Sequence, residues 1–292
     1  MTKRFVGAAF AATIGSMTDS MIHSDLFTLV PGDTPLLVNV PHAGLGLAPG
    51  LDARLTPAGQ SLADTDWHVG TLYEFVTGLG VGLMVAAQSR YVVDLNRDPG
   101  GRALYPGADN TEICPTRGFD GGPLYRDGAA PDKADIAARV ARYWQPYHDR
   151  LAAELDVIRA RHGYAILLDG HSICAEVPRF FTGRLPDLNL GTNDGRSCAP
   201  DLAAAAAKVL AGASGLTHVH NGRFKGGYIT RHYGRPADGL HALQLEIAQA
   251  CYMDEANPRH WDAGRAAKLG AVLRQLVEAL LRWPPPRRGR NA

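Results

Sequence analysis

The stretch YAILLDGHSICAE, residues 164–176, carries the clearest strand signal in the chain. Its apolar run bears no charge until Asp169, and the ionisable ring of His171 follows after one glycine. A short apolar run of this kind is typical of a strand that is buried on both faces. A second stretch, LLVNVPHAG at 36–44, repeats the pattern and places His42 directly after its apolar run. Two histidines at two strand exits are candidates for one shared site.

Apolar runs alternate with longer amphipathic stretches along the rest of the chain. Strands are predicted at 35–40, 82–88, 91–96, 164–169 and 241–248. Helices are predicted at 64–79, 136–163, 200–213 and 263–283, and Pro146 should kink or split the second of them. The glycine- and proline-rich span 97–131 is expected to be a long functional loop. This alternation predicts an α/β fold, with a single domain and a mixed central β-sheet flanked by helices.

The composition is that of an ordinary globular chain of 292 residues with a formal net charge of +1. This charge balance gives no reason to expect nucleic acid or an anionic membrane as a partner, and it says nothing of the oligomeric state. Four scattered cysteines without a C-x-x-C pair favour reduced thiols and a cytoplasmic protein. The folded domain is expected over residues 25–283. Residues 1–24 are interpreted as a loose arm or a wrongly assigned start, with a secretory signal left open, and residues 284–292 as a disordered tail.

His42 and His171 are predicted to be two ligands of a metal ion. Ligand sites of α/β sheets gather at the carboxyl ends of the strands, where both histidines lie. A catalytic zinc site has three protein ligands, often including a carboxylate, and keeps one position for water. Asp66 is the preferred third ligand and Asp64 the alternative, since either aspartate could instead cap a helix. Asp169 could orient the ring of His171 from behind. Zinc is favoured, although iron or cobalt would also suit this donor set.

Glu246 is the candidate general base, because it lies inside the apolar strand LQLEIAQ, where an ionised carboxylate needs a partner or a function. A strand-end carboxylate paired with a surface arginine is the simpler alternative. Loop arginines are candidates for binding carboxylates, since a guanidinium grips a carboxylate through two parallel hydrogen bonds. Arg97, beside Asn96, and Arg231 are the best of these. Arg90, Arg102 and Arg235 are equally well explained as solvated loop residues.

Eight short motifs, in order from about residue 25 to about residue 280, resemble those of the N-formylglutamate amidohydrolases (formylglutamate deformylases). They are VNVPHAGLGLAP (38–49), ADTDWHVGTLYE (63–74), SRYVVDLNRDP (89–99), LYPG (104–107), CPTRGFDGGPLY (114–125), ILLDGHSI (166–173), LGTNDGRSC (190–198) and GGYITRHYG (226–234). Each motif is weak alone, but eight in order are specific. The resemblance implies hydrolysis of N-formyl-L-glutamate, a small dicarboxylate, to L-glutamate and formate at the end of histidine degradation.

The resemblance also implies the phosphorylase/hydrolase-like fold of the zinc carboxypeptidases. In that wider group, a glutamate three residues after the first histidine supplies a second ligand. Leu45 occupies this position here, so the carboxylate ligand must come from elsewhere, which again points to Asp64 or Asp66. The Asn96–Arg97 pair resembles the pair that holds a substrate carboxylate in those relatives.

The implied mechanism is metal-assisted amide hydrolysis, with Glu246 moving the proton and with Arg97 and Arg231 clamping the two carboxylates. Two alternatives remain: an amidohydrolase for a different acyl group, and a non-catalytic member that binds a metal or an acidic ligand. A Ser-His-Asp hydrolase is a weaker rival, because the G-x-S-x-G motif is absent around Ser172.

Overall fold

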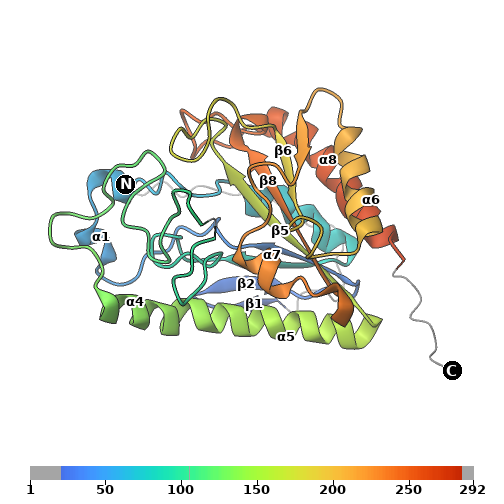
Figure 1. Ribbon diagram of the computed structural model, residues 1–292, viewed down its shortest axis with the longest axis horizontal. Coiled ribbons are helices and arrows are strands. Elements are labelled where there is room, and N and C mark those ends of the chain that lie inside the picture. The colour runs from blue at the N-terminus through green and yellow to red at the C-terminus, as the bar shows by residue number, and fades with distance from the viewer. Residues whose placement is uncertain (1–20, 105, 285–292) are drawn as a thin grey trace, which may run out of the picture.

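The computed structural model describes residues 21–104 and 106–284 and is built around one eight-stranded sheet (Figure 1). Its spatial order is β1-β2-β4-β3-β5-β8-β6-β7. The strands are β1 (Ile22–His23), β2 (Phe27–Val30), β3 (Leu36–Val40), β4 (Gly82–Ala86), β5 (Ala165–Ile173), β6 (Leu188–Gly191), β7 (His218–His220) and β8 (Leu240–Ala248). The four central strands β4, β3, β5 and β8 are parallel, whereas β2 and β6 run antiparallel to their central neighbours. The predicted mixed sheet is confirmed.

Helices cover both faces of this sheet. They are α1 (Leu51–Arg54), α2 (Pro57–Gln60), α3 (Val69–Tyr73), α4 (Lys133–Arg139), α5 (Gln145–His162), α6 (Pro200–Ala211), α7 (Tyr228–Tyr233) and α8 (Ala263–Arg282). Short 3₁₀ turns lie at Glu74–Leu79, Pro236–Asp238 and Gln249–Cys251, and a π-helical turn lies at Val140–Trp144. Figure 1 shows α6 and α8 on one side of the sheet and the long α5 on the other. The predicted α/β class is therefore correct.

Alternate residues of the central strands enter two separate cores. In β3, Leu36, Val38 and Val40 pack toward α3, α6 and α8, while Leu37 packs toward α5. Successive side chains of a strand point to opposite faces, so a strand that is covered on both sides must be apolar throughout. The uninterrupted apolar runs of the central strands follow from this double burial. Polar residues on the α5 side therefore stand out, and His171 and Glu246 of the candidate site are among them.

Two predicted elements differ in the structure. The segment 91–96, predicted as a strand, is a pair of turns. The guanidinium of Arg139 donates to the carbonyls of Tyr91 and Val92. These backbone groups therefore have hydrogen-bond partners although the buried segment does not pair with a strand. The helix predicted at 64–79 begins only at Val69 and continues as a 3₁₀ turn, which leaves Asp64 and Asp66 in the preceding turn.

The helix predicted at 136–163 is split near Pro146 by the π-helical turn Val140–Trp144, which joins α4 to α5; Gln145 lies between this turn and the proline. Proline has no N–H to donate, and an inserted residue is one way in which a helix accommodates it. The span 97–131 is a long connection without a named helix or strand among its described residues, as predicted.

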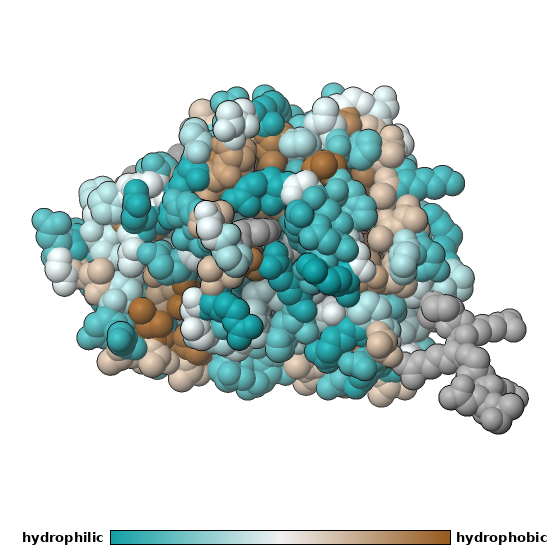
Figure 2. All heavy atoms as spheres, in the orientation of Figure 1, coloured by the Kyte–Doolittle hydropathy of each residue, from teal (hydrophilic) through white to brown (hydrophobic). Residues whose placement is uncertain are grey.

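The short edge strands β1, β2, β6 and β7 were not predicted. Part of the expected N-terminal arm, Ile22–His23, pairs with β2 as strand β1. The rest of that arm and the expected tail, residues 1–20 and 285–292, lie outside the described residues. No described helix is both long and apolar enough to cross a membrane. The face seen in Figure 2 is mainly hydrophilic, with its apolar residues in small separate groups.

Candidate active site

Three buried side chains meet at the carboxyl ends of the parallel strands. His42 lies two residues beyond β3, and Asp66 lies in the turn before α3. His171 is one of the last three residues of β5. The backbone N–H of Asp66 donates to the carbonyl of His42 at 3.1 Å, which fixes the turn against the end of β3. The backbone N–H of Ser172 donates to the Asp66 carboxylate, also at 3.1 Å. The backbone therefore holds all three residues in place.

The side chains of His42, Asp66 and His171 present a set of atoms suited to a metal ion. Oδ2 of Asp66 lies 3.0 Å from Nδ1 of His171 and 3.7 Å from Nδ1 of His42. One ligand atom from each residue lies within 4.8 Å of the others. Oδ1 of Asp66 is buried and has no hydrogen-bond partner among the described residues. Two imidazole nitrogens, one carboxylate and an unpartnered buried oxygen fit a cation, because a cation would supply the missing partner.

A second carboxylate stands behind each histidine. Nε2 of His42 donates to Asp94 at 2.7 Å, and Nε2 of His171 donates to Asp169 at 2.9 Å. Asp169 in turn accepts a hydrogen bond from Asn39 at 2.8 Å. Carboxylates in this position fix the ring orientation and leave the other ring nitrogen for a metal. Both Nδ1 atoms are therefore aimed at Asp66. Asp169 was singled out in the sequence for this position, whereas Asp94 was not.

Burial and the neighbouring charges shift the pKa of each of the three clustered side chains. Burial disfavours the charged form of His171, but Asp169 and Asp66 outweigh it and hold the pKa of His171 well above its usual value. Burial and the nearby Arg90 lower the pKa of His42. Burial raises the pKa of Asp66, but the hydrogen bond from His171 and the neighbouring cations bring it below its usual value. A metal ion requires neutral imidazoles, so its binding would release the proton of His171.

Arg90 is buried beside the cluster, with 8% of its side chain exposed, and it lines the pocket. Its Nη2 contacts Nδ1 of His42 and lies 3.6 Å from Oδ2 of Asp94, while its Nη1 lies 3.9 Å from Oδ1 of Asp66. The simpler interpretation of Arg90 as a solvated loop residue is therefore wrong. One imidazole lone pair serves one partner, so Nδ1 of His42 can hold either this guanidinium or a cation, but not both at once.

Glu246 lies directly opposite His171 in the pairing of β5 with β8, and both side chains line the same pocket. Gln244 donates to its carboxylate at 3.2 Å. Burial raises the pKa of Glu246 to about 7, in spite of the opposing effects of His171 and Arg90. A carboxyl group with a pKa near neutrality can both accept and return a proton at physiological pH. The alternative of a strand-end carboxylate paired with a surface arginine does not match this burial.

Asp64 lies outside the cluster that contains Asp66. Its carboxylate accepts the backbone N–H of Phe119 at 3.0 and 3.2 Å, and burial raises its pKa. Its carbonyl accepts a hydrogen bond from Arg90 at 3.2 Å. Asp64 therefore ties the long loop to the turn that carries Asp66.

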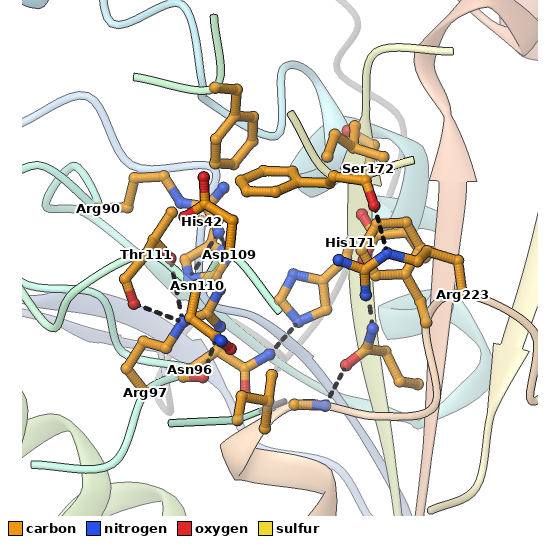
Figure 3. Close-up of a pocket in the computed structure, with 18 residues that line it drawn as sticks. His42, Arg90, Asn96, Arg97, Asp109, Asn110, Thr111, His171, Ser172 and Arg223 are labelled. Atoms are coloured by element: carbon orange, nitrogen blue, oxygen red, sulfur yellow. Dashed lines mark hydrogen bonds between the residues drawn. The ribbon is translucent and has the colours of Figure 1, made fainter. Parts of the chain in front are cut away.

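The pocket above the cluster has cationic side chains on its walls. Figure 3 shows Arg97 and Arg223 on either side of His171. Arg97 donates to Thr111 and to the carbonyl of Asn96, and Arg223 donates to the carbonyl of Phe180. These contacts hold both guanidinium groups beside the cavity, where a carboxylate could pair with them.

Two residues expected to bind substrate have other contacts in the structure. The side-chain nitrogen of Asn96 lies 2.9 Å from Nε2 of His171, and its oxygen accepts the backbone N–H of Ile229 at 2.8 Å. Gly227 is needed beside it, because a Cβ at that position would lie 2.3 Å from the Asn96 side chain. Arg231 is not among the described residues that line this pocket, and it donates to the carbonyls of Gly226 and Leu104. Since Leu104 does line the pocket, Arg231 supports its wall.

Comparisons with known proteins are consistent with one another. The family model described as N-formylglutamate amidohydrolase matches residues 34–253. The N-formylglutamate deformylase of Pseudomonas aeruginosa is 50% identical over 252 residues, which cover 86% of this chain and 94% of that protein. The Pseudomonas putida N-formylglutamate deformylase is 47% identical over the same shares. The crystal structure of N-formylglutamate amidohydrolase from Ralstonia eutropha JMP134 matches with a TM-score of 0.71 and 28% identity, covering 89% of this chain and 97% of that chain.

The first prediction concerns the two neighbouring aspartates. Asp66→Asn should weaken zinc binding by more than about 100-fold, because loss of an outer-shell partner alone typically costs 10–100-fold. Asp64→Asn is the matched control and should bind zinc as the unaltered protein does, since its carboxylate lies outside the cluster and accepts the backbone N–H of Phe119. Equilibrium dialysis against zinc followed by elemental analysis measures both. Equal zinc affinity of the two variants would contradict the assignment.

Proposed function

The chain belongs to the N-formylglutamate amidohydrolase family, and we propose that it hydrolyses N-formyl-L-glutamate to L-glutamate and formate. The observation that carries this proposal is the buried cluster of His42, Asp66 and His171 at the base of a pocket with arginines on its walls. Such a donor set suits amide hydrolysis, and cationic walls suit a substrate with two carboxylates. We also propose, on the resemblance alone, that the reaction completes histidine degradation.

A divalent metal ion is proposed as the cofactor, held by Nδ1 of His42, Nδ1 of His171 and the carboxylate of Asp66. Zinc is favoured by two nitrogens and one carboxylate, and iron or cobalt are the alternatives. Polarisation of the formyl oxygen and activation of a water molecule are the chemistry that such an ion supplies when bound.

Glu246 is proposed as the group that moves the proton. It accepts a proton from the attacking water as the bond from oxygen to the formyl carbon forms. It then returns that proton to the amide nitrogen as the carbon–nitrogen bond breaks, which releases formate and the amino group of glutamate. Arg90, at the edge of the cluster, is placed to stabilise the negative charge that develops on the formyl oxygen.

Arg97 and Arg223 are proposed to bind the two carboxylates of the substrate. Both line the pocket, and their anchoring to Thr111 and Phe180 holds them in position before the substrate arrives. A substrate held at both carboxylates has its formyl group fixed against the reacting groups, which lowers the entropic cost of the reaction. Arg231 is proposed to position Leu104 in the pocket wall, through its hydrogen bond to the Leu104 carbonyl, rather than to bind the substrate.

The second prediction tests the reaction itself. The protein should release formate from N-formyl-L-glutamate, should lose this activity on exhaustive chelation, and should regain it on addition of zinc. Formate release is measured with a coupled assay, and elemental analysis reports the metal content of each sample. Full activity in a sample without metal would contradict the metal site. Absence of formate release from the zinc-loaded protein would contradict the proposed reaction.

The third prediction concerns the pH dependence that Glu246 imposes. A base must be ionised to act, so kcat/KM should rise with pH while Glu246 loses its proton and level off above that range. Burial sets the pKa at about 7, and a bound cation would lower it, so the rise should lie at or below about pH 7. Glu246→Gln should lower kcat by about 10²–10⁴ and abolish this rise. A Gln variant with unchanged kcat and an unchanged pH profile would exclude Glu246 as the base.

The fourth prediction compares two arginines of the same loop. Arg97→Gln should lower kcat/KM for N-formyl-L-glutamate by roughly 10- to 150-fold, because hydrogen bonds to a charged partner contribute about 1.5–3 kcal/mol. Arg102→Gln is the control, since Arg102 is 87% exposed, and its kcat/KM should stay within about twofold of the unaltered enzyme. Steady-state kinetics decide between the outcomes. Equal effects of the two substitutions would remove Arg97 from the binding site.

A further inference from the structure

A second cavity adjoins the active-site pocket. This side cavity, of about 300 Å³, is lined mainly by apolar and small residues such as Ala58, Leu124 and Val177, with Asp64, Asp120 and Glu176 among its polar residues. Phe119, Ser172 and Ile173 line both the side cavity and the pocket, so they form the partition between the two. Ser172 and Ile173 belong to β5, whereas Phe119 projects from the long loop. Phe119 is therefore the part of the partition that does not belong to the central sheet.

The ring of Phe119 lies at the metal end of the pocket. The Arg90 guanidinium, which contacts His42, lies 5.0 Å from the centre of this ring. The ring of Phe180 packs edge-on against it, with a centroid distance of 5.1 Å. Phe119 thus stands beside the reacting groups and is supported on its other side by a second aromatic ring.

Asp64 fixes the backbone of this partition. Its buried carboxylate accepts the backbone N–H of Phe119, and the turn around it is closed by hydrogen bonds from Gly118 to Gly122 and from Gly121 to Gly118. The ring is therefore held in place by a buried anion rather than by packing alone. This gives a positioning role to the aspartate that the metal cluster does not include.

From these contacts we infer that Phe119 is the specificity-determining residue for the acyl group, closing the pocket against the side cavity so that formyl fits and larger acyl groups do not. The inference rests on the proposed function. The amino-acid part of the substrate extends toward Arg97 and Arg223, and the carbonyl oxygen faces the cluster. The third substituent of the carbonyl carbon, a hydrogen in the formyl group, must then face the remaining wall beside the cluster. A methyl or ethyl group in its place meets the Phe119 ring.

Removal of the ring should join the two cavities and change the acyl preference. We would measure kcat/KM for N-formyl-, N-acetyl- and N-propionyl-L-glutamate with the zinc-loaded enzyme and its Phe119→Ala and Phe119→Leu variants. The ratio of acetyl to formyl turnover should rise at least about tenfold in Phe119→Ala, since one methylene in an apolar pocket changes specificity by 10- to 200-fold. Phe119→Leu should give a smaller rise. Water adds across the amide in each case, giving the free acid and glutamate.

Phe181→Ala is the matched control. Phe181 packs on Phe224, which lines the pocket, but Phe181 itself is not among the described residues that line either cavity. The ratio of acetyl to formyl turnover should therefore not change in this variant. Asp64→Ala should raise the ratio of acetyl to formyl turnover as Phe119→Ala does, while the zinc content stays unchanged. Loss of a residue that only stabilises the fold would not change this ratio. Unchanged ratios in Phe119→Ala, with formyl turnover retained, would overturn the inference.

A binding measurement separates this inference from the proposed function. Calorimetry of N-propionyl- and N-formyl-L-glutamate with zinc-loaded Glu246→Gln, with and without Phe119→Ala, reports the acyl preference without turnover. A gain in relative propionyl affinity on removal of the ring supports the partition even if the unaltered enzyme releases no formate. No gain contradicts the partition, whatever the enzyme hydrolyses.

Discussion

The buried carboxylate of Asp66, held between two imidazole rings, is the interaction on which the rest of the site depends. An ionised carboxylate in the interior is costly unless positive charge and hydrogen bonds compensate it. The structure supplies Nδ1 of His171 and the N–H of Ser172 to one oxygen and leaves the other without a hydrogen bond. The compensation is therefore incomplete at one oxygen of Asp66. Asp94 and Asp169 orient the two rings from behind, and Arg90 stands at the open side.

The pocket has a different chemistry on each side of this cluster. Glu246, facing His171 across β5 and β8, provides a carboxyl group whose pKa lies near neutrality because it is buried. Arg97 and Arg223 place positive charge on the walls of the pocket. Phe119 forms an uncharged aromatic wall beside Arg90. Strands β5 and β8 hold His171 and Glu246, and turns at the same edge of the sheet hold His42 and Asp66, while the long loop carries Arg97 and Phe119. This division lets the loops vary in specificity without disturbing the reacting groups.

Sequence patterns predicted the parts of the fold that depend on local burial. The strands around 36–40, 165–169 and 241–248 were predictable because double burial requires continuous apolar runs. His42 and His171 could be paired because the carboxyl ends of neighbouring parallel strands share one edge of the sheet. The strand predicted at 91–96 was wrong, because Arg139, from helix α4, donates hydrogen bonds to the carbonyls of Tyr91 and Val92 in place of a neighbouring strand. Asp94 follows an apolar pair as Asp169 does, so the same pattern could have identified it. Arg223 and Phe119 could not be identified, since long-range contacts such as that of Asp64 with Phe119 determine the course of their loops.

The most direct test of the metal centre is X-ray absorption at the zinc edge of the protein loaded with one equivalent of zinc. The proposed ligands predict nitrogen and oxygen neighbours at about 2.0–2.2 Å, with the outer-shell scattering of two imidazole rings. Substitution of His171 by alanine should remove the scattering of one ring. A sulfur neighbour at about 2.3 Å, or a spectrum without imidazole scattering, would contradict a site formed by His42, Asp66 and His171.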